Sequence, residues 1–149
     1  MKHIDYLKKI VGLFEFRVIS DKRGNEFVLL ADNMISNVDF VEDKTAFEAS
    51  ENHVHIINNI KKDDMESLVS IGKILGETLT NILKVSFPEK EFMVFVSLRL
   101  NDSMIIRFHQ RWQNELPYCN PEEFRSENEK VFLFTTETNQ SISNTREYQ

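Results

Sequence analysis

Residues 92–110 read FMVFVSLRLNDSMIIRFHQ, two apolar runs separated by a short polar stretch. This pattern predicts a β-hairpin. A three-residue loop over 101–103 would pair Leu98 with Ile106 and keep one face of the hairpin apolar, so we prefer it to a two-residue loop. The opposite face would then carry mainly polar and cationic side chains, namely Ser97, Arg99, Arg107 and His109.

The segment before this hairpin predicts a long helix over 63–86. Apolar residues recur there at helical spacing. Asp63 and Glu66 have the spacing of a capping box at its start. Gly72 and Gly76 lie four residues apart inside it, although each costs about 1 kcal/mol relative to alanine. We therefore expect these two positions to allow close approach to the sheet or to another helix.

The rest of the chain predicts shorter elements and completes an α+β fold. We expect an antiparallel sheet of about five to six strands, including two hairpins, packed against one long central helix and a short N-terminal helix. Residues 1–134 would form this single domain, and the polar residues 135–149 a flexible tail. The shorter elements expected are a helix ending at Gly12, a hairpin over 13–31, a strand over 34–41, an acidic loop over 42–51, a strand over 53–60, a short helix after Asn120 and a strand over 131–134.

Composition limits where the chain acts and what it binds. The 149 residues include one cysteine and no uninterrupted apolar stretch of the length a spanning helix needs. The first residues lack the apolar core of a signal peptide, so we expect a cytoplasmic protein. The net charge of −6 disfavours nucleic acid and anionic membranes as partners and favours a basic protein. The oligomeric state is left open.

Two charged groups of residues are candidates for binding a partner. The first is the acidic set Glu42, Asp43, Glu48 and Glu51. The second is the cationic set Arg99, Arg107, His109 and Arg111, with Trp112 beside it. Arginine forks match carboxylates, but these arginines could equally pair with the protein's own glutamates, such as Glu115 or Glu123.

Residue patterns for catalysis or metal binding are weak. His53 and His55 would share a strand face, and His109 could join them, but no acidic ligand is set by spacing. Cys119 has no neighbouring base, so a buried loop thiol is the simpler interpretation. Phosphate-cradling glycine loops and nucleophile elbows are absent from the sequence. We expect no catalytic residue, no cofactor and no metal.

The segment Met104–Glu115, MIIRFHQRWQNE, resembles a pattern in small bacterial proteins encoded beside polymorphic or contact-dependent toxins. In those proteins a strand ending Arg-Phe-His is followed by a polar turn and a glutamate. The resemblance implies an immunity protein, which binds and neutralises a cognate toxin domain without catalysis.

Two alternative functions remain open. The order of helices and strands also resembles the acidic dimeric chaperones of type III secretion, which bind an effector segment across apolar patches. An extra strand at 53–60 departs from that pattern. The other alternative is a small-ligand-binding α+β domain.

Overall fold

The computed structural model describes residues 2–124, 126–136 and 145–148, and of residues 2, 3 and 145–148 it describes the backbone alone. This part of the chain contains three α-helices, two short 3-10 helices and seven strands. In chain order they are α1 (Lys2–Gly12), β1 (Phe16–Ser20), β2 (Glu26–Leu30), α2 (Lys44–Glu51), β3 (His53–Ile57), η1 (Lys62–Asp64), α3 (Met65–Ser86), β4 (Phe92–Arg99), β5 (Met104–Gln110), η2 (Pro121–Phe124), β6 (Glu129–Thr136) and β7 (Thr145–Tyr148).

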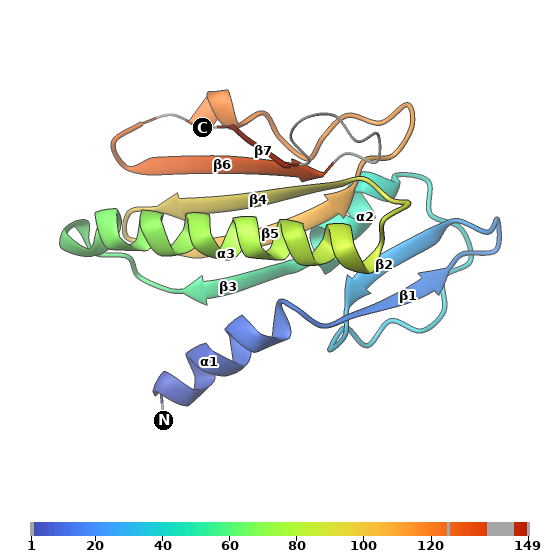
Figure 1. Cartoon of the computed structure of the whole chain (residues 1–149), viewed down its shortest axis with the longest axis horizontal. Coiled ribbons are helices and arrows are strands. Elements are labelled where there is room, and N and C mark those ends of the chain that lie inside the picture. The colour runs from blue at the N-terminus through green and yellow to red at the C-terminus, as the bar shows by residue number, and fades with distance from the viewer. Residues whose placement is uncertain (1, 125, 137–144, 149) are drawn as a thin grey trace.

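The main core lies between α3 and one face of a five-stranded antiparallel sheet. The strand order is β3-β5-β4-β6-β7, whereas β1 and β2 form a separate two-stranded sheet. α3 runs across the larger sheet (Figure 1). Its Leu79 and Leu83 are fully buried in one cluster with Val96, Phe108 and Phe134 of the sheet. The predicted α+β class, its two hairpins and its long helix are confirmed, although the strands divide between two sheets.

Gly72 and Gly76 bring α3 close to this sheet, as their spacing predicts. A β-carbon at Gly76 would lie 2.7 Å from carbons of both Phe134 and Val96. At Gly72 it would lie 2.9 Å from Val96. Real β-carbons essentially never come this close to other atoms, so any larger residue must push the helix or the sheet away.

We expect Gly76→Ala to destabilise the fold by about 1–2 kcal/mol, because overpacking outweighs the gain of about 1 kcal/mol in helix propensity. Gly12→Ala is the matched control, since nothing lies within 4 Å of a β-carbon there. Urea unfolding of both variants measures the difference. Equal stability of the two variants would show that α3 can move away from the sheet at little cost.

The β4–β5 register differs from the expected one by two residues. Leu98 pairs with Met104, and Val96 with Ile106. The chain reverses through a longer turn, which is closed by a hydrogen bond from Arg99 N to Ser103 O at 3.3 Å. A slip of two residues keeps each side chain on its own face, so the predicted apolar and polar faces are both present.

The acidic loop expected over 42–51 is wrong, because residues 44–51 form α2. The Asp43 side chain caps this helix by accepting a hydrogen bond from Ala46 N at 2.9 Å. Helical spacing places Glu48 and Asn52 on one side of α2, where both are fully buried. α2 is thus an amphipathic helix whose inward face contains polar residues.

The strand expected over 34–41 is also absent, since α2 occupies the edge of β2 that such a strand would need. Val28 N donates to Glu48 Oε2 at 3.0 Å, and Leu30 N donates to Asn52 Oδ1 at 3.0 Å. Asn52 Nδ2 in turn donates to Val28 O at 2.8 Å. Of the apolar residues in 34–41, Ile35 and Val38 pack over the small cluster that contains Phe27.

The start of α3 differs from the predicted one, and α1 packs only part of its apolar side against the core. The expected capping box at Asp63 is not formed: η1 precedes α3, and the N-cap Asp64 makes no side-chain hydrogen bond. In α1, Ile10 packs against the main core, whereas three other apolar residues of the helix are exposed. These residues are Ile4, Leu7 and Val11.

The expected boundary at residue 134 is not where the fold ends. Residues 135 and 136 continue β6, and β7 pairs with β6 through Leu133 and Tyr148. The remainder of the expected tail, 137–144 and 149, lies outside the described residues. Within the helices that are described, none has the length and apolar character needed to cross a membrane.

Candidate functional site

Two grooves meet at Tyr118, and one of them lies on the sheet face opposite α3. The chain after β5 folds back over this face, where Cys119 and Phe124 pack on the buried side chains of Met93 and Phe95. We call residues 115–119 the lip. The acid-rimmed groove, of about 420 Å³, lies between the lip and the start of α2 and is lined by Glu42, Asp43, Thr45, Ala46, Glu115, Leu116, Pro117 and Tyr118. The Arg107 groove, of about 400 Å³, lies on the sheet and is lined by Phe95, Ser97, Ile105, Arg107, Tyr118, Cys119, Phe124, Glu129 and Val131.

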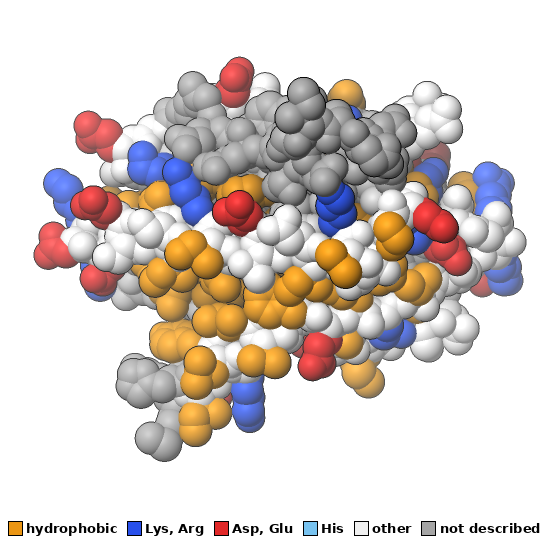
Figure 2. Space-filling view, in the orientation of Figure 1, with side chains coloured by type: hydrophobic (Ala, Val, Ile, Leu, Met, Phe, Trp, Pro, Cys, Tyr) orange, Lys and Arg blue, Asp and Glu red, His pale blue; other side chains and the backbone are white. Residues whose placement is uncertain are grey.

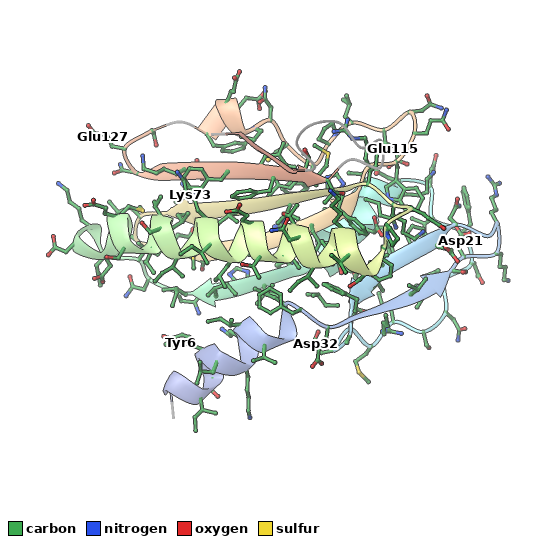
Figure 3. All side chains as sticks on the ribbon, in the orientation of Figure 1. Tyr6, Asp21, Asp32, Lys73, Glu115 and Glu127 are labelled. Carbon is green, nitrogen blue, oxygen red and sulfur yellow. The ribbon has the colours of Figure 1, made fainter. Side chains whose placement is uncertain are left out.

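Glu115 attaches the first end of the lip to α2. Its carboxylate accepts hydrogen bonds from Lys44 N at 3.2 Å and Thr45 N at 2.7 Å, and pairs with Lys44 Nζ at 3.3 Å. Figure 3 labels Glu115 in this position beside the helix. Burial raises the pKa of Glu115, but the hydrogen bonds from Thr45 and Lys44 outweigh it, so the pKa lies below its usual value. The carboxylate therefore caps α2 as an anion.

His109 attaches the other end of the lip to β5. Its Nε2 accepts a hydrogen bond from Tyr118 N at 3.1 Å, and its Nδ1 lies 2.7 Å from Gln110 O. These contacts assign the proton to Nδ1. Burial lowers the pKa of His109, which favours the neutral ring that this arrangement requires. The imidazole is thus a structural bridge.

Glu48 holds α2 against both sheets. Its two carboxylate oxygens accept four hydrogen bonds of 2.8–3.0 Å. Burial raises the pKa of Glu48 to about 7, although each of its hydrogen bonds acts in the opposite direction. Because Asp43 and Thr45 lie on the same helix, this network also positions the acid-rimmed groove. The four donors are Val28 N, Gln110 N, Gln110 Nε2 and Trp112 Nε1.

Arg107 is the cation of the second groove. Its Nη1 donates to Ala49 O at 2.8 Å, and its guanidinium lies 4.3 Å from the centre of the Tyr118 ring. Burial lowers the pKa of Arg107, but arginine remains protonated at neutral pH. In the part of the chain that is described, no carboxylate forms an ion pair with it.

The structure brings together only three of the nine predicted partner-binding residues. Glu42 and Asp43 are exposed at the acid-rimmed groove, and Arg107 lies across the lip from them. Arg99 is exposed at the end of β4, opposite Glu129, and Glu51 accepts a hydrogen bond from Asn33. Arg99 therefore lies near the far end of the Arg107 groove, whereas Glu51 belongs to another part of the surface.

Four other residues do not form the expected binding surface. Glu48 and His109 are buried, and their polar atoms are taken up by hydrogen bonds within the protein. Trp112 packs 5.4 Å from Phe27 and donates to Glu48. Arg111 lies 3.9 Å from Glu91. Arg99, Arg107 and His109 share one face of the sheet, as predicted, but Arg111 and Trp112 do not extend this cluster, since the chain turns away from the sheet after Gln110.

The three histidines do not come together as metal ligands. The rings of His53 and His55 lie 5.5 Å apart on a shared strand face, as predicted, but both ring nitrogens of His109 are engaged. No group of three or more potential metal ligands occurs among the described side chains. Burial raises the pKa of the Cys119 thiol to about 11, which disfavours the reactive thiolate.

Sequence reasoning missed Leu116 and Tyr118, the two large exposed apolar side chains of the lip. Both flank Pro117 in an otherwise polar, irregular stretch. Large apolar side chains next to a rigid proline, outside any periodic pattern, were the available signal.

Comparison with known proteins gives a family but no function. The family model described as "Uncharacterized protein PM0498 family" matches residues 12–146. No curated protein and no solved structure matches the chain.

Proposed function

The chain belongs to the uncharacterized protein PM0498 family, and from this premise we propose a function based on the geometry of the lip. We propose that the protein is a cytoplasmic, non-catalytic binding protein that neutralises a cognate bacterial toxin, as immunity proteins do. The toxin would dock on the lip and the acid-rimmed groove. This surface offers an apolar anchor beside two carboxylates.

One observation carries this proposal: Leu116 is 85% exposed although the lip around it is firmly attached. Glu115 and His109 fasten the lip at two points, so the exposed side chain does not belong to a free loop. A large apolar side chain presented on a preorganised segment has the character of an interface hot spot. Tyr118 beside it can contribute both apolar area and a hydroxyl.

The charge around the lip supports a basic partner. Glu42 and Asp43 are exposed at the groove, and the whole chain has a net charge of −6. Complementary charge speeds the encounter of two proteins and fixes their orientation. The non-catalytic part of the proposal is supported by the state of three nearby groups: Glu115 and His109 are used to hold the lip, and the Cys119 thiol has a raised pKa.

We expect Glu42→Lys to slow association with the partner by about tenfold at low salt, with little effect at high salt. Asp32→Lys is the matched control, because Asp32 is also exposed, lies outside both grooves and changes the net charge equally. The partner is first obtained by co-expression with the products of neighbouring reading frames. Association rates then follow from surface plasmon resonance at two ionic strengths.

Leu116→Ala tests the anchor and should raise the dissociation constant at least tenfold. Two results together would show that the interface lies elsewhere than on the lip. They are unchanged partner binding by Leu116→Ala and equal association rates for the two lysine variants. Loss of toxin inhibition in parallel with loss of binding would connect the surface to neutralisation.

A second candidate function, the secretion chaperone, is favoured by exposed apolar side chains on the opposite side of the molecule. Figure 2 shows apolar side chains along α3 and down toward α1. Ile74 is 64% and Val85 80% exposed on α3, and Leu7 is exposed on α1. Contiguous apolar surface of this kind suits an extended, unfolded segment. Ile74→Asp would then abolish capture of the partner, whereas Leu116→Ala would leave it unchanged.

A further inference from the structure

The Arg107 groove combines an apolar floor with a cation that has no ion-pair partner among the described residues. Phe95, Ile105, Phe124 and Val131 supply the apolar lining. Arg107 is half-buried, and beyond its bond to Ala49 O its guanidinium makes no hydrogen bond to the residues described. A desolvated cation with free N–H groups, directed toward a groove, is a site for an anion.

The structure holds the guanidinium ready for such an anion. The bond from Nη1 to Ala49 O fixes one side of the planar group, and the Tyr118 ring supports it from a distance of 4.3 Å. A cation fixed in this way loses little side-chain entropy when it binds. Tyr118 is itself held by His109, so the whole arrangement is anchored to β5.

The charges around the groove select for a single negative charge. Glu129 closes the other end of the groove, where Arg99 lies directly across from it in the β4–β6 register. Glu123 acts on Cys119 and adds further negative potential. Across the β3–β5 register, His53 lies opposite Arg107 and contributes no carboxylate. One arginine among these acids suits a carboxylate better than a multiply charged phosphate.

We propose that the Arg107 groove binds a carboxylate that is attached to an apolar group. The carboxylate lies against the Arg107 guanidinium, and the apolar group lies on Ile105 and Phe124. The volume of about 400 Å³ is within the range of small-molecule sites. Two sources offer this chemistry: a free organic acid and the C-terminal carboxylate of a polypeptide that ends in an apolar residue.

The test uses the full chain and 3-phenylpropanoate as the probe, with 3-phenylpropanamide as its neutral counterpart. NMR titration should give saturable shifts at Arg107 and Tyr118 and a dissociation constant on the order of 1 mM. The amide should bind at least tenfold more weakly, because it lacks the charge. A peptide ending in Leu-Phe with a free carboxylate, compared with its amidated form, tests the polypeptide source.

Arg107→Gln should weaken binding of the acid at least tenfold, whereas Arg99→Gln, also an arginine near this groove, should leave it within about twofold. Ser97→Leu fills the groove while keeping Arg107, so it should also abolish binding of the acid. This second variant tests the proposal if Arg107→Gln folds poorly. Any of three results would overturn the proposed carboxylate site. These are no saturable binding by either carboxylate, equal affinity for the acid and the amide, and unchanged affinity in Arg107→Gln. Because Leu116→Ala lies outside this groove, its effect on a protein partner is independent of these results.

Discussion

Glu48→Ala is expected to cost about 4 kcal/mol of folding free energy at neutral pH, the largest effect of any single substitution considered. The change removes the acceptor of four N–H groups from a site that water does not reach. Each buried donor left without a partner costs about 1–3 kcal/mol, and partial relaxation keeps the total below the sum. Since small domains are stable by about 5–15 kcal/mol, the variant would be close to unfolding.

Urea unfolding followed by fluorescence measures this loss directly, because Trp112 is the single tryptophan and donates to Glu48. Glu51→Ala is the matched control on the same helix: Glu51 is only half-buried and accepts one bond, from Asn33. We expect that control to cost less than about 1 kcal/mol. A Glu48→Ala protein as stable as the Glu51→Ala protein would show that water or a rearranged side chain replaces the carboxylate.

The same substitution should also disturb the acid-rimmed groove. Glu48 joins α2 to β2 and to Gln110 at the end of β5, and the start of α2 forms one side of that groove. Loosening of α2 would therefore displace Asp43 relative to the lip. Under the proposed function, Glu48→Ala would therefore weaken both folding and binding of the partner at this groove.

Periodic patterns allowed the larger elements to be predicted. Helical spacing located α3, and the preference for one consistently apolar face assigned both faces of the β4–β5 hairpin, even though its register was wrong by two residues. Face assignment survives such a slip because side chains repeat every two residues along a strand. The two glycines of α3 were interpreted correctly because their cost in a helix demands a packing reason.

The loop predicted over 42–51 is wrong because some polar side chains of this region point inward. Glu48 and Asn52 resemble surface residues by composition, yet they satisfy the edge of β2 in place of a third strand. That role depends on partners twenty or more residues away, which local patterns do not contain. The lip was missed for a related reason, since its attachment to α2 and β5 is set by tertiary hydrogen bonds.

The free energy of unfolding is expected to fall, relative to that of Glu48→Gln, as pH rises from about 4.5 to about 7. Burial raises the pKa of Glu48 from 4.5 to about 7 in the folded protein. In this pH range the folded state keeps a proton that the unfolded state releases, so raising the pH favours unfolding. The full effect is about 3 kcal/mol, present below pH 4.5 and lost above about pH 7.

Urea unfolding of the wild type and Glu48→Gln, at several values from about pH 5 to about pH 8, measures this difference. The side-chain amide of the Glu48→Gln variant cannot titrate, so it shifts the free energy of unfolding by the same amount at every pH. The pH-dependent part of the difference between the two proteins therefore comes from the Glu48 carboxyl. Glu115, whose pKa is lowered, acts in the opposite direction at lower pH and cancels because both proteins contain it. Parallel curves would mean that the four N–H donors keep Glu48 ionised throughout, and that its hydrogen bonds outweigh its burial.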